Sequence, residues 1–322
     1  RDPYPPITDT VPPTFTTPLT DMWVRTLILY SAARFDRFYT GSETITATGL
    51  LARLAALAAH DDVHGKLVNL DDYPELVRAY AQWDRYPTSP QHANHVAMTI
   101  KSLLYSLSPA YPNLEYLVIV GDDHIIPQRR IRDEALIANE RTYAGEVGAP
   151  HIAESLERRY ILTDDYYAGL LPIPWLGREL YLPQMGIGRL VEKPSEIVAA
   201  VDTFLARPFV APDDALVTGY DFLLDQATAI SDALVAQGIP AAGLTTLIRD
   251  DWTADDLRAA LISVTQSSDL DSLNAHFQHF LLIPATTPVS PTTLADVYVF
   301  AVEITDTTDY SGTLHFSVGC HS

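Results

Sequence analysis

The chain has 322 residues, of which 47% are hydrophobic, so it can bury the cores of two domains of ordinary size. Because 41 acidic residues stand against 21 Lys and Arg, its net charge at pH 7 is −20. Such a charge repels nucleic acid and anionic membranes, and it favours cationic peptides or divalent metals as partners. We also expect no membrane span, because no apolar run approaches the roughly 20 residues that a span needs.

The first residues are rich in proline and threonine. Six of the first 20 residues are proline, a composition typical of an extended linker or of a strap on the surface. We assign residues 1–22 to this segment. Because the chain starts with Arg1 and shows no signal peptide, we expect its start to be a processed or trimmed end of a longer protein.

From Val24 onward, strand-like and helix-like segments alternate, which is typical of parallel sheets covered by helices. Short apolar runs predict strands, and apolar residues at helical spacing predict helices. The predicted strands of the first half are 25–31, 66–70, 116–120 and 184–190, and the predicted helices lie near 50–58, 90–107 and 194–204. Residues 128–183 show little periodicity, so we expect an excursion from the sheet there.

A stretch rich in Pro and Asp, 207–214, separates this half from a second alternation. We therefore expect an N-terminal α/β subdomain at 23–208 and a C-terminal α/β catalytic subdomain at 209–322. The second alternation predicts strands at 215–220, 244–247, 269–275 and 312–318, and helices at 226–237 and 253–262. The sequence thus predicts two doubly wound, mostly parallel-sheet subdomains behind an extended Pro-rich segment.

Cys320 is the only cysteine, and it follows the last predicted strand just as His276 follows the strand at 269–275. Ligands of open α/β sheets bind at the carboxyl edge of the strands, which is where both side chains are expected. A thiol attacks a carbonyl as the thiolate, and an imidazole nearby accepts the proton and later protonates the leaving amine. Cys320 and His276 are therefore a candidate nucleophile and base. The alternative is that Cys320 is a small buried hydrophobic residue.

Two other histidines compete with His276 for the role of base. His279 lies between Phe277 and Phe280, where a packed or solvent-facing ring is the simpler interpretation, and His321 is adjacent to the thiol. His276 is favoured because it ends the strand. The spacing of His276 and His279 would also suit a zinc ion, but no Cys or Glu lies nearby in the sequence to complete the ligand set.

Three acidic pairs could supply oxygen ligands to a hard cation such as calcium, which takes six to eight of them. They are Asp122 with Asp123, Asp133 with Glu134, and Asp164 with Asp165. Most acidic pairs are instead caps, turns or solvated surface. The first pair, at the tip of a buried strand, also suggests a phosphoacceptor pocket, although the partners expected downstream are not evident.

Several catalytic motifs are absent from the sequence. There is no Gly-x-Ser-x-Gly elbow, no His-Glu-x-x-His helix and no phosphate-binding Gly-Lys-Thr loop. Gly186 and Gly188 supply only two glycines of a dinucleotide-binding loop. Serine hydrolase, zinc peptidase and nucleotidase functions therefore have no support.

Short segments along the chain, taken in order, form a further pattern. They are Glu115–Asp122, Ile126–Pro127, Leu162–Tyr167, Gly186–Leu190 followed by Glu196, Asn274–His276 and Ser317–Cys320. This order resembles the gingipain-type (C25) family of cysteine peptidases, which share the caspase-like fold. The likeness spans residues 25–322, and the order of the segments is more specific than any one of them.

The resemblance implies His276 as general base and Cys320 as nucleophile, on neighbouring strands of the second subdomain, with no cofactor required for the chemistry. Backbone N–H groups near both residues would stabilise the oxyanion. The family commonly has Gly directly after the catalytic His, whereas this chain has Phe277. Members bind calcium through acidic loops, which implies Asp164 and Asp165 as ligands of a structural Ca²⁺ ion.

The resemblance also bears on specificity and on the extent of the chain. The loop after the strand at 215–220 would border the specificity pocket, so Asp221 or Asp225 would select a basic P1 side chain. Similar enzymes continue after the nucleophile with a helix and more sheet. We therefore expect this chain to be a fragment or a processed product.

We thus expect a cysteine endopeptidase that cleaves polypeptides with a Cys320/His276 dyad. The rival hypothesis is a non-catalytic caspase-like module of a larger secreted or surface assembly. In either case we expect no nucleic-acid partner and further domains of the same precursor. One cysteine permits no internal disulfide that would decide the compartment, and an extracellular or cell-surface location is favoured.

Overall fold

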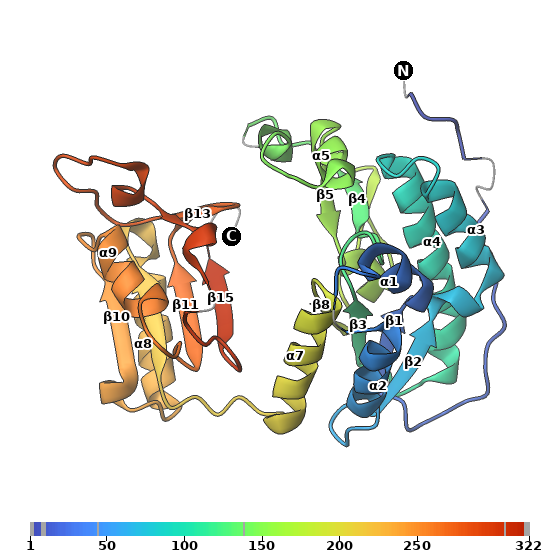
Figure 1. The fold of residues 1–322 in the computed structure, drawn as a ribbon, viewed down its shortest axis with the longest axis horizontal. Coiled ribbons are helices and arrows are strands. Elements are labelled where there is room, and N and C mark those ends of the chain that lie inside the picture. Colours follow the sequence, from blue (N-terminus) through green and yellow to red (C-terminus); the bar gives the residue numbers. More distant parts are fainter. Residues whose placement is uncertain (1–2, 8–10, 44, 138, 306, 319–322) are drawn as a thin grey trace. The chain divides into compact units, whose positions relative to one another are not determined.

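The computed structural model describes residues 3–7, 11–43, 45–137, 139–305 and 307–318. The chain divides into two units, Arg1–Leu205 and Ala206–Ser322, each with its own parallel sheet (Figure 1). The predicted α/β class with two mostly parallel sheets is confirmed. Within the described ranges, no helix combines the length and the apolar character that crossing a membrane requires.

The first unit is built on four parallel strands in the order β2-β1-β3-β8. Their bounds are Thr26–Tyr30 for β1, Gly65–Asn69 for β2, Tyr116–Val120 for β3 and Gly186–Leu190 for β8. The central strands β1 and β3 are continuous apolar runs that are largely buried, as expected for strands with both faces covered.

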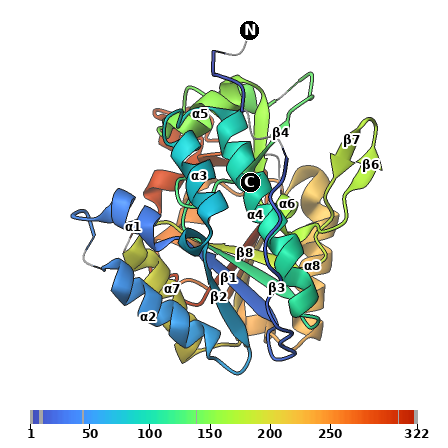
Figure 2. The same cartoon turned by 90° about the vertical axis from the view of Figure 1, so that its right-hand side faces the viewer.

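Helices cover both faces of this sheet. They are α1 (Ala32–Tyr39), α2 (Ala47–Ala58), α3 (Pro74–Trp83), α4 (Pro90–Leu107) and α7 (Pro194–Ala206). Figures 1 and 2 show α3 and α4 together on one face and α2 and α7 on the other. The bounds of α4 agree with the prediction, because Ser89 caps its first turn and Pro90 suits that turn. The sequence analysis did not identify α1 and α3.

The predicted excursion lies between β3 and β8 and contains its own short elements. They are β4 (Arg129–Arg132), η3 (Glu140–Tyr143), α5 (Pro150–Glu157), β5 (Tyr160–Thr163), α6 (Asp165–Ala168), β6 (Ile173–Trp175) and β7 (Arg178–Leu180). β4 pairs antiparallel with β5, and β6 pairs antiparallel with β7. Two 3₁₀ turns complete the unit, η1 (Leu70–Asp72) and η2 (Ser108–Ala110).

The described part of the Pro-rich segment forms no helix or strand before residue 22. Phe15 is buried, its ring meets that of Tyr73 at 5.5 Å, and its N–H donates to Ser106 Oγ at 3.3 Å. The Tyr4 hydroxyl is 2.8 Å from Thr88 Oγ1. These contacts attach the segment to the first unit at two separate points.

The second unit has a four-stranded parallel sheet in the order β10-β9-β11-β15. Its strands are β9 (Ala215–Gly219), β10 (Leu244–Ile248), β11 (Leu270–Asn274) and β15 (Leu314–Val318). A smaller antiparallel sheet follows, with β12 (His276–Gln278), β13 (Leu281–Ile283) and β14 (Val299–Phe300). The sequence analysis predicted the four parallel strands but not the small sheet.

The helices and helical turns of the second unit lie between its strands in the sequence. They are η4 (Asp221–Leu223), α8 (Leu224–Ala236), η5 (Ala241–Gly243), α9 (Ala254–Leu257) with a π-helical turn η6 (Arg258–Ile262), η7 (Leu294–Asp296) and η8 (Ala301–Glu303). A capping box between Thr253 and Asp256 starts α9, as the sequence indicates. Gly219 lets α8 approach β9, since a Cβ there would lie 2.3 Å from the Cβ of Ala227.

Candidate active site

The strands that precede the predicted catalytic residues are neighbours in the second unit. β11 and β15 are parallel, and their register pairs Asn274 with Val318. The N–H of Ala275 donates to the carbonyl of Val318 at 3.2 Å, so the two strands end at the same edge. His276 is the second residue after Asn274, and Cys320 is the second residue after Val318 in the sequence. Cys320 itself lies outside the described residues.

His276 begins β12 and is held there by Tyr220, the residue after β9. The N–H of His276 donates to the Tyr220 hydroxyl at 3.2 Å, and this hydroxyl donates to the carbonyl of Ile283 at 2.7 Å. Burial raises the pKa of Tyr220, which keeps the hydroxyl protonated as a donor. The rings of Tyr220 and Phe222 meet the imidazole edge-on at 5.4 and 5.5 Å. The imidazole is thus held on two sides while 37% of the side chain stays exposed.

Asp221 brings a carboxylate to this imidazole. Its Oδ2 lies 3.7 Å from His276 Nε2, and 66% of its side chain is exposed. Its backbone is in the left-handed region, with φ 54°, which costs a residue with a Cβ roughly 1–2 kcal/mol. The N–H of Asp221 donates to Asp250 Oδ1 at 2.7 Å, a bond that holds the turn. The carboxylate of Asp221 is therefore directed toward the ring.

Asp225, the second predicted specificity residue, is exposed in the first turn of α8. Among the described residues, no hydrogen bond or ion pair joins it to His276. His279 lies in the tight turn between β12 and β13, and His321 is outside the described residues. Of the predicted site residues that are described, the structure brings Asp221 and His276 together.

Asn274 is a buried polar residue at the carboxyl end of β11. Its Nδ2 donates to the carbonyl of Thr218 and to Ser272 Oγ, both at 2.9 Å. The Thr218 carbonyl fixes the orientation of the amide, because it can only accept and a flipped amide would turn its oxygen toward it. Asn274 Oδ1 is then a buried acceptor that has no partner among the described residues. This edge of the second sheet thus presents a fixed acceptor two residues before His276.

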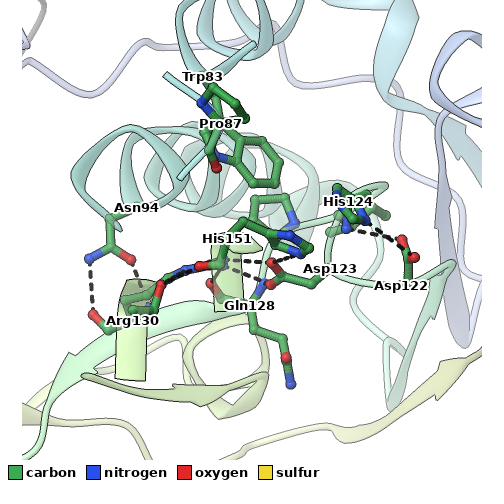
Figure 3. A network of polar contacts seen from close by, with 12 residues as sticks. Trp83, Pro87, Asn94, Asp122, Asp123, His124, Gln128, Arg130 and His151 are labelled. Atoms are coloured by element: carbon green, nitrogen blue, oxygen red, sulfur yellow. Dashed lines mark hydrogen bonds and ion pairs between the residues drawn. The ribbon is translucent and has the colours of Figure 1, made fainter. Parts of the chain in front are cut away.

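In the first unit, Asp123 belongs to a buried polar network rather than to an open site (Figure 3). Both of its carboxylate oxygens accept hydrogen bonds from Arg130, at 2.7 and 2.5 Å, and His151 Nε2 lies 3.1 Å away. Burial opposes ionisation of Asp123, but the Arg130 guanidinium and the hydrogen bonds outweigh it and hold the pKa of Asp123 well below its ordinary value. The carboxylate is therefore charged and fully used inside the fold.

Asp122 stabilises the loop after β3. Its Oδ1 accepts the N–H groups of His124 and Ile125, at 2.9 and 3.2 Å, and its Oδ2 accepts the hydroxyl of Tyr39 at 3.0 Å. Burial opposes its ionisation, yet hydrogen bonds from His124 and Tyr39 lower the pKa of Asp122 below its usual value. The imidazole rings of His124 and His151 are in contact, with centroids 3.7 Å apart and planes inclined at 46°. The first acidic pair is thus explained by turn and network contacts.

The predicted calcium ligands lie at the start of α6. Both oxygens of Asp164 accept hydrogen bonds from Arg189, at 2.6 and 2.8 Å, and Arg189 also donates to the carbonyl of Gly121 at 2.7 Å. Asp165 is exposed. Among the residues that the structure describes, no group of three or more His, Cys, Asp or Glu could hold a metal ion. An ion bound by Asp164 would compete with Arg189, and the calcium site stays a prediction.

Comparisons with known proteins bear on the fold. No family model matches the chain, and no curated protein does either. A solved structure described as a protease matches 93% of this chain and 52% of its own, with 13% identity and a TM-score of 0.50. The Arg-specific cysteine proteinase gingipain R matches 95% of this chain and 57% of its own, with 12% identity and a TM-score of 0.48, a similarity too weak to support an inference. The chain thus spans about half the length of these structures, and its fold is similar to that of the first.

Sequence reasoning missed the residues that position His276. Tyr220 and Phe222 flank the predicted specificity residue Asp221, and Asp250 follows β10. A local signal existed, because the three missed residues, like Asp221, follow strands of one parallel sheet and so lie at its carboxyl edge. Their roles depend on contacts across 29 to 63 residues of sequence, which no local pattern reveals.

Proposed function

We propose that this chain is a cysteine endopeptidase in which Cys320 is the nucleophile and His276 the general base. The observation that carries the proposal is the register of β11 and β15, which pairs Asn274 with Val318. Cys320 and His276 follow these two residues at equal offsets. Equal offsets from a registered pair favour their meeting at one sheet edge, where α/β proteins bind ligands. The similarity of the fold to that of a solved protease structure agrees with this function.

The chemistry follows the usual order for a thiol and an imidazole. His276 accepts the thiol proton, and the thiolate attacks the scissile carbonyl carbon, so that an oxyanion forms. The tetrahedral intermediate collapses when the C–N bond breaks, and the imidazolium protonates the leaving amine. Water then attacks the thioester while His276 accepts a proton from it. Breaking the C–S bond releases the carboxylic acid product and restores the ion pair of the Cys320 thiolate and the His276 imidazolium.

Asp221 acts in this proposal as a positioning residue. A carboxylate 3.7 Å from His276 Nε2 favours the imidazolium that forms in each half-reaction. Asp225 then keeps the predicted role of selecting a basic P1 side chain. The acidic loops after β9 and β10 support a cationic substrate, since the N–H of Asp221 donates to Asp250 Oδ1 and so keeps both acidic residues in one region.

Alkylation of the single thiol separates the enzyme from the rival hypothesis of a non-catalytic module. A thiol activated by His276 reacts with iodoacetamide at pH 6–7 at least tenfold faster than free cysteine, because more of it is thiolate. His276→Gln removes this advantage, and the matched variant His279→Gln, on the same hairpin, keeps it. A thiol that reacts like free cysteine in all three proteins favours the non-catalytic module.

Turnover of peptides with Arg, Lys, Ala or Glu at P1 tests the chemistry directly. Cys320→Ala should abolish cleavage. Asp221→Asn should lower kcat roughly tenfold or more and change its pH profile, because the imidazolium loses its carboxylate. Asp225→Asn should raise KM for Arg and Lys peptides alone. Equal cleavage of Glu and Arg peptides would contradict the assignment of a basic P1 preference.

A further inference from the structure

A pocket of about 230 Å³ lies in the second unit, between the α9–η6 helix and the small antiparallel sheet. Its lining is apolar except for Gln278 and His279. Leu257, Leu261 and Val299 form buried walls. An apolar cavity of about 150 Å³ accommodates benzene. The pocket therefore has room for one aromatic or branched aliphatic side chain, and its lining matches such a group.

The pocket and the candidate active site are linked by β12, which contributes residues to both. Successive side chains of a strand point to opposite faces, so Phe277 points away from the face that His276 occupies. Phe277 lines the pocket and packs against the core of this unit, while His276 contacts Tyr220 and Phe222. β12 thus presents the proposed base on one face and an apolar pocket on the other.

β12 is also the end strand of its sheet, whose order among the described residues is β12-β13-β14. An extended peptide that pairs with an end strand directs alternate side chains to the two faces of the sheet. One side chain of such a peptide would face His276, and its neighbour would face the pocket. The net charge of −20 disfavours fatty acids and other anions with an apolar tail, and it favours neutral or cationic peptides.

We propose that this pocket binds one aromatic or branched aliphatic side chain of a peptide substrate, next to the position that His276 faces. This inference rests on the proposed peptidase function for the identity of its ligand. The binding itself is measured without turnover, so the two proposals fail separately.

The binding experiment uses the full chain carrying Cys320→Ala, with labelled Leu and Val methyl groups observed by NMR. N-acetylphenylalanine amide should produce saturable shifts at Leu261, Leu282 and Val299, and N-acetylglycine amide should not. Ala301→Phe, which fills the pocket, should weaken this binding at least tenfold. Val302→Phe is the matched control, because Val302 is exposed and does not line the pocket.

If Ala301→Phe lowers the folded population, Phe280→Ala provides the second variant. It widens the pocket and should shift its preference toward N-acetyltryptophan amide. Absence of methyl shifts with the phenylalanine amide in the parent protein would overturn the proposal, whatever the turnover result. A change of oligomeric state with Ala301→Phe would also overturn it, because the pocket would then be covered by a second copy.

In the active protein, the test compares peptides that carry either Phe or Gly at one position, with each position taken in turn. At one of these positions the Phe peptide should have a kcat/KM at least tenfold higher than the Gly peptide. Ala301→Phe should abolish this difference, whereas Val302→Phe should preserve it. Turnover without any such position would also contradict the proposal. If no peptide is cleaved, the peptidase proposal fails, and methyl shifts alone decide whether the pocket binds the side chain.

Discussion

The buried ion pair of the first unit offers a quantitative test of the structure. Side-chain exposure is 1% for Arg130 and 4% for Asp123, and two hydrogen bonds join the guanidinium to the carboxylate. Replacing Arg130 by Met keeps most of the side-chain volume but removes the cation. The Asp123 carboxylate then stays buried with the N–H of Gln128 at 2.8 Å and His151 Nε2 at 3.1 Å. Its main compensating charge is lost.

The expected cost is large. Removing one partner of a buried ion pair destabilises a protein by about 3–5 kcal/mol, which is consistent with two hydrogen bonds to a charged group at roughly 1.5–3 kcal/mol each. For a unit of this size, 1 kcal/mol lowers the melting temperature by roughly 2–4 °C. Arg130→Met should therefore lower the melting temperature of the first unit by roughly 6–20 °C.

The pH dependence gives a second, independent signature of Asp123. In the parent protein its pKa is depressed, so the pair contributes stability above the unfolded pKa of about 3.9, and this stability is lost as the pH falls through the folded pKa. In Arg130→Met, burial raises the pKa of Asp123 above the unfolded value. The variant carboxyl then takes up a proton first, so the difference between the two proteins should be largest near pH 7 and should shrink in acid.

Differential scanning calorimetry and urea unfolding between pH 4 and 8 measure both effects. Arg132→Met is the matched control on the same strand, because Arg132 is exposed, and it should change stability by no more than roughly 0.5 kcal/mol. The double variant Asp123→Asn with Arg130→Met should recover part of the loss by removing both charges. A loss below about 1 kcal/mol, or a loss independent of pH, would refute the buried ion pair.

Three further predictions concern other parts of the chain. Asn274→Ala removes three hydrogen bonds to buried acceptors and should cost about 1–3 kcal/mol in urea unfolding; an unchanged midpoint would contradict the network. Burial lowers the pKa of Lys101 to about 8. The unfolded chain therefore binds more protons than the folded one between pH 8 and about 10.4, and the free energy of unfolding should rise by roughly 1–3 kcal/mol across this range. Lys101→Met should abolish that rise. If Asp164 and Asp165 bind Ca²⁺, 1 mM Ca²⁺ raises the melting temperature and a chelator lowers it; identical melting curves would exclude the site.

The parts of the fold that sequence patterns predicted are those in which local and tertiary preferences agree. β3 is an uninterrupted apolar run, and α4 combines a serine cap, proline in the first turn and a buried face at helical spacing. β4 is the opposite case. Its sequence, Arg129–Arg132, contains three arginines and has no apolar run that would predict a strand. Its conformation depends on pairing with β5 and on the ion pair of Arg130 with Asp123, both of which exist only in the folded protein.

In the candidate site, too, the sequence predicted what depends on local patterns and missed what depends on contacts in the folded protein. The position of His276 after a strand was readable, because β11 has a recognisable pattern and parallel strands expose their carboxyl ends. Asp221 was predicted as a specificity residue, and its approach to His276 depends on the neighbouring positions of β9 and β11. Tyr220 contributes through a hydroxyl that bridges His276 and Ile283. A buried tyrosine after a strand gives no sequence signal that distinguishes this role from simple packing.

The acidic pairs of the first unit and the region around His276 differ in how far their polar groups are already bonded within the fold. Asp122, Asp123 and Asp164 accept hydrogen bonds from backbone N–H groups or arginines of the same unit, so their charges are already compensated within the fold. At the corresponding edge of the second sheet, His276 and Asp221 are held by their backbones while their side chains stay partly open to solvent. A fold can use a fully compensated carboxylate for stability, whereas catalysis needs polar groups that are positioned but still able to bond a substrate. On this criterion the second unit, and not the acidic loops of the first, has the arrangement expected of a catalytic site.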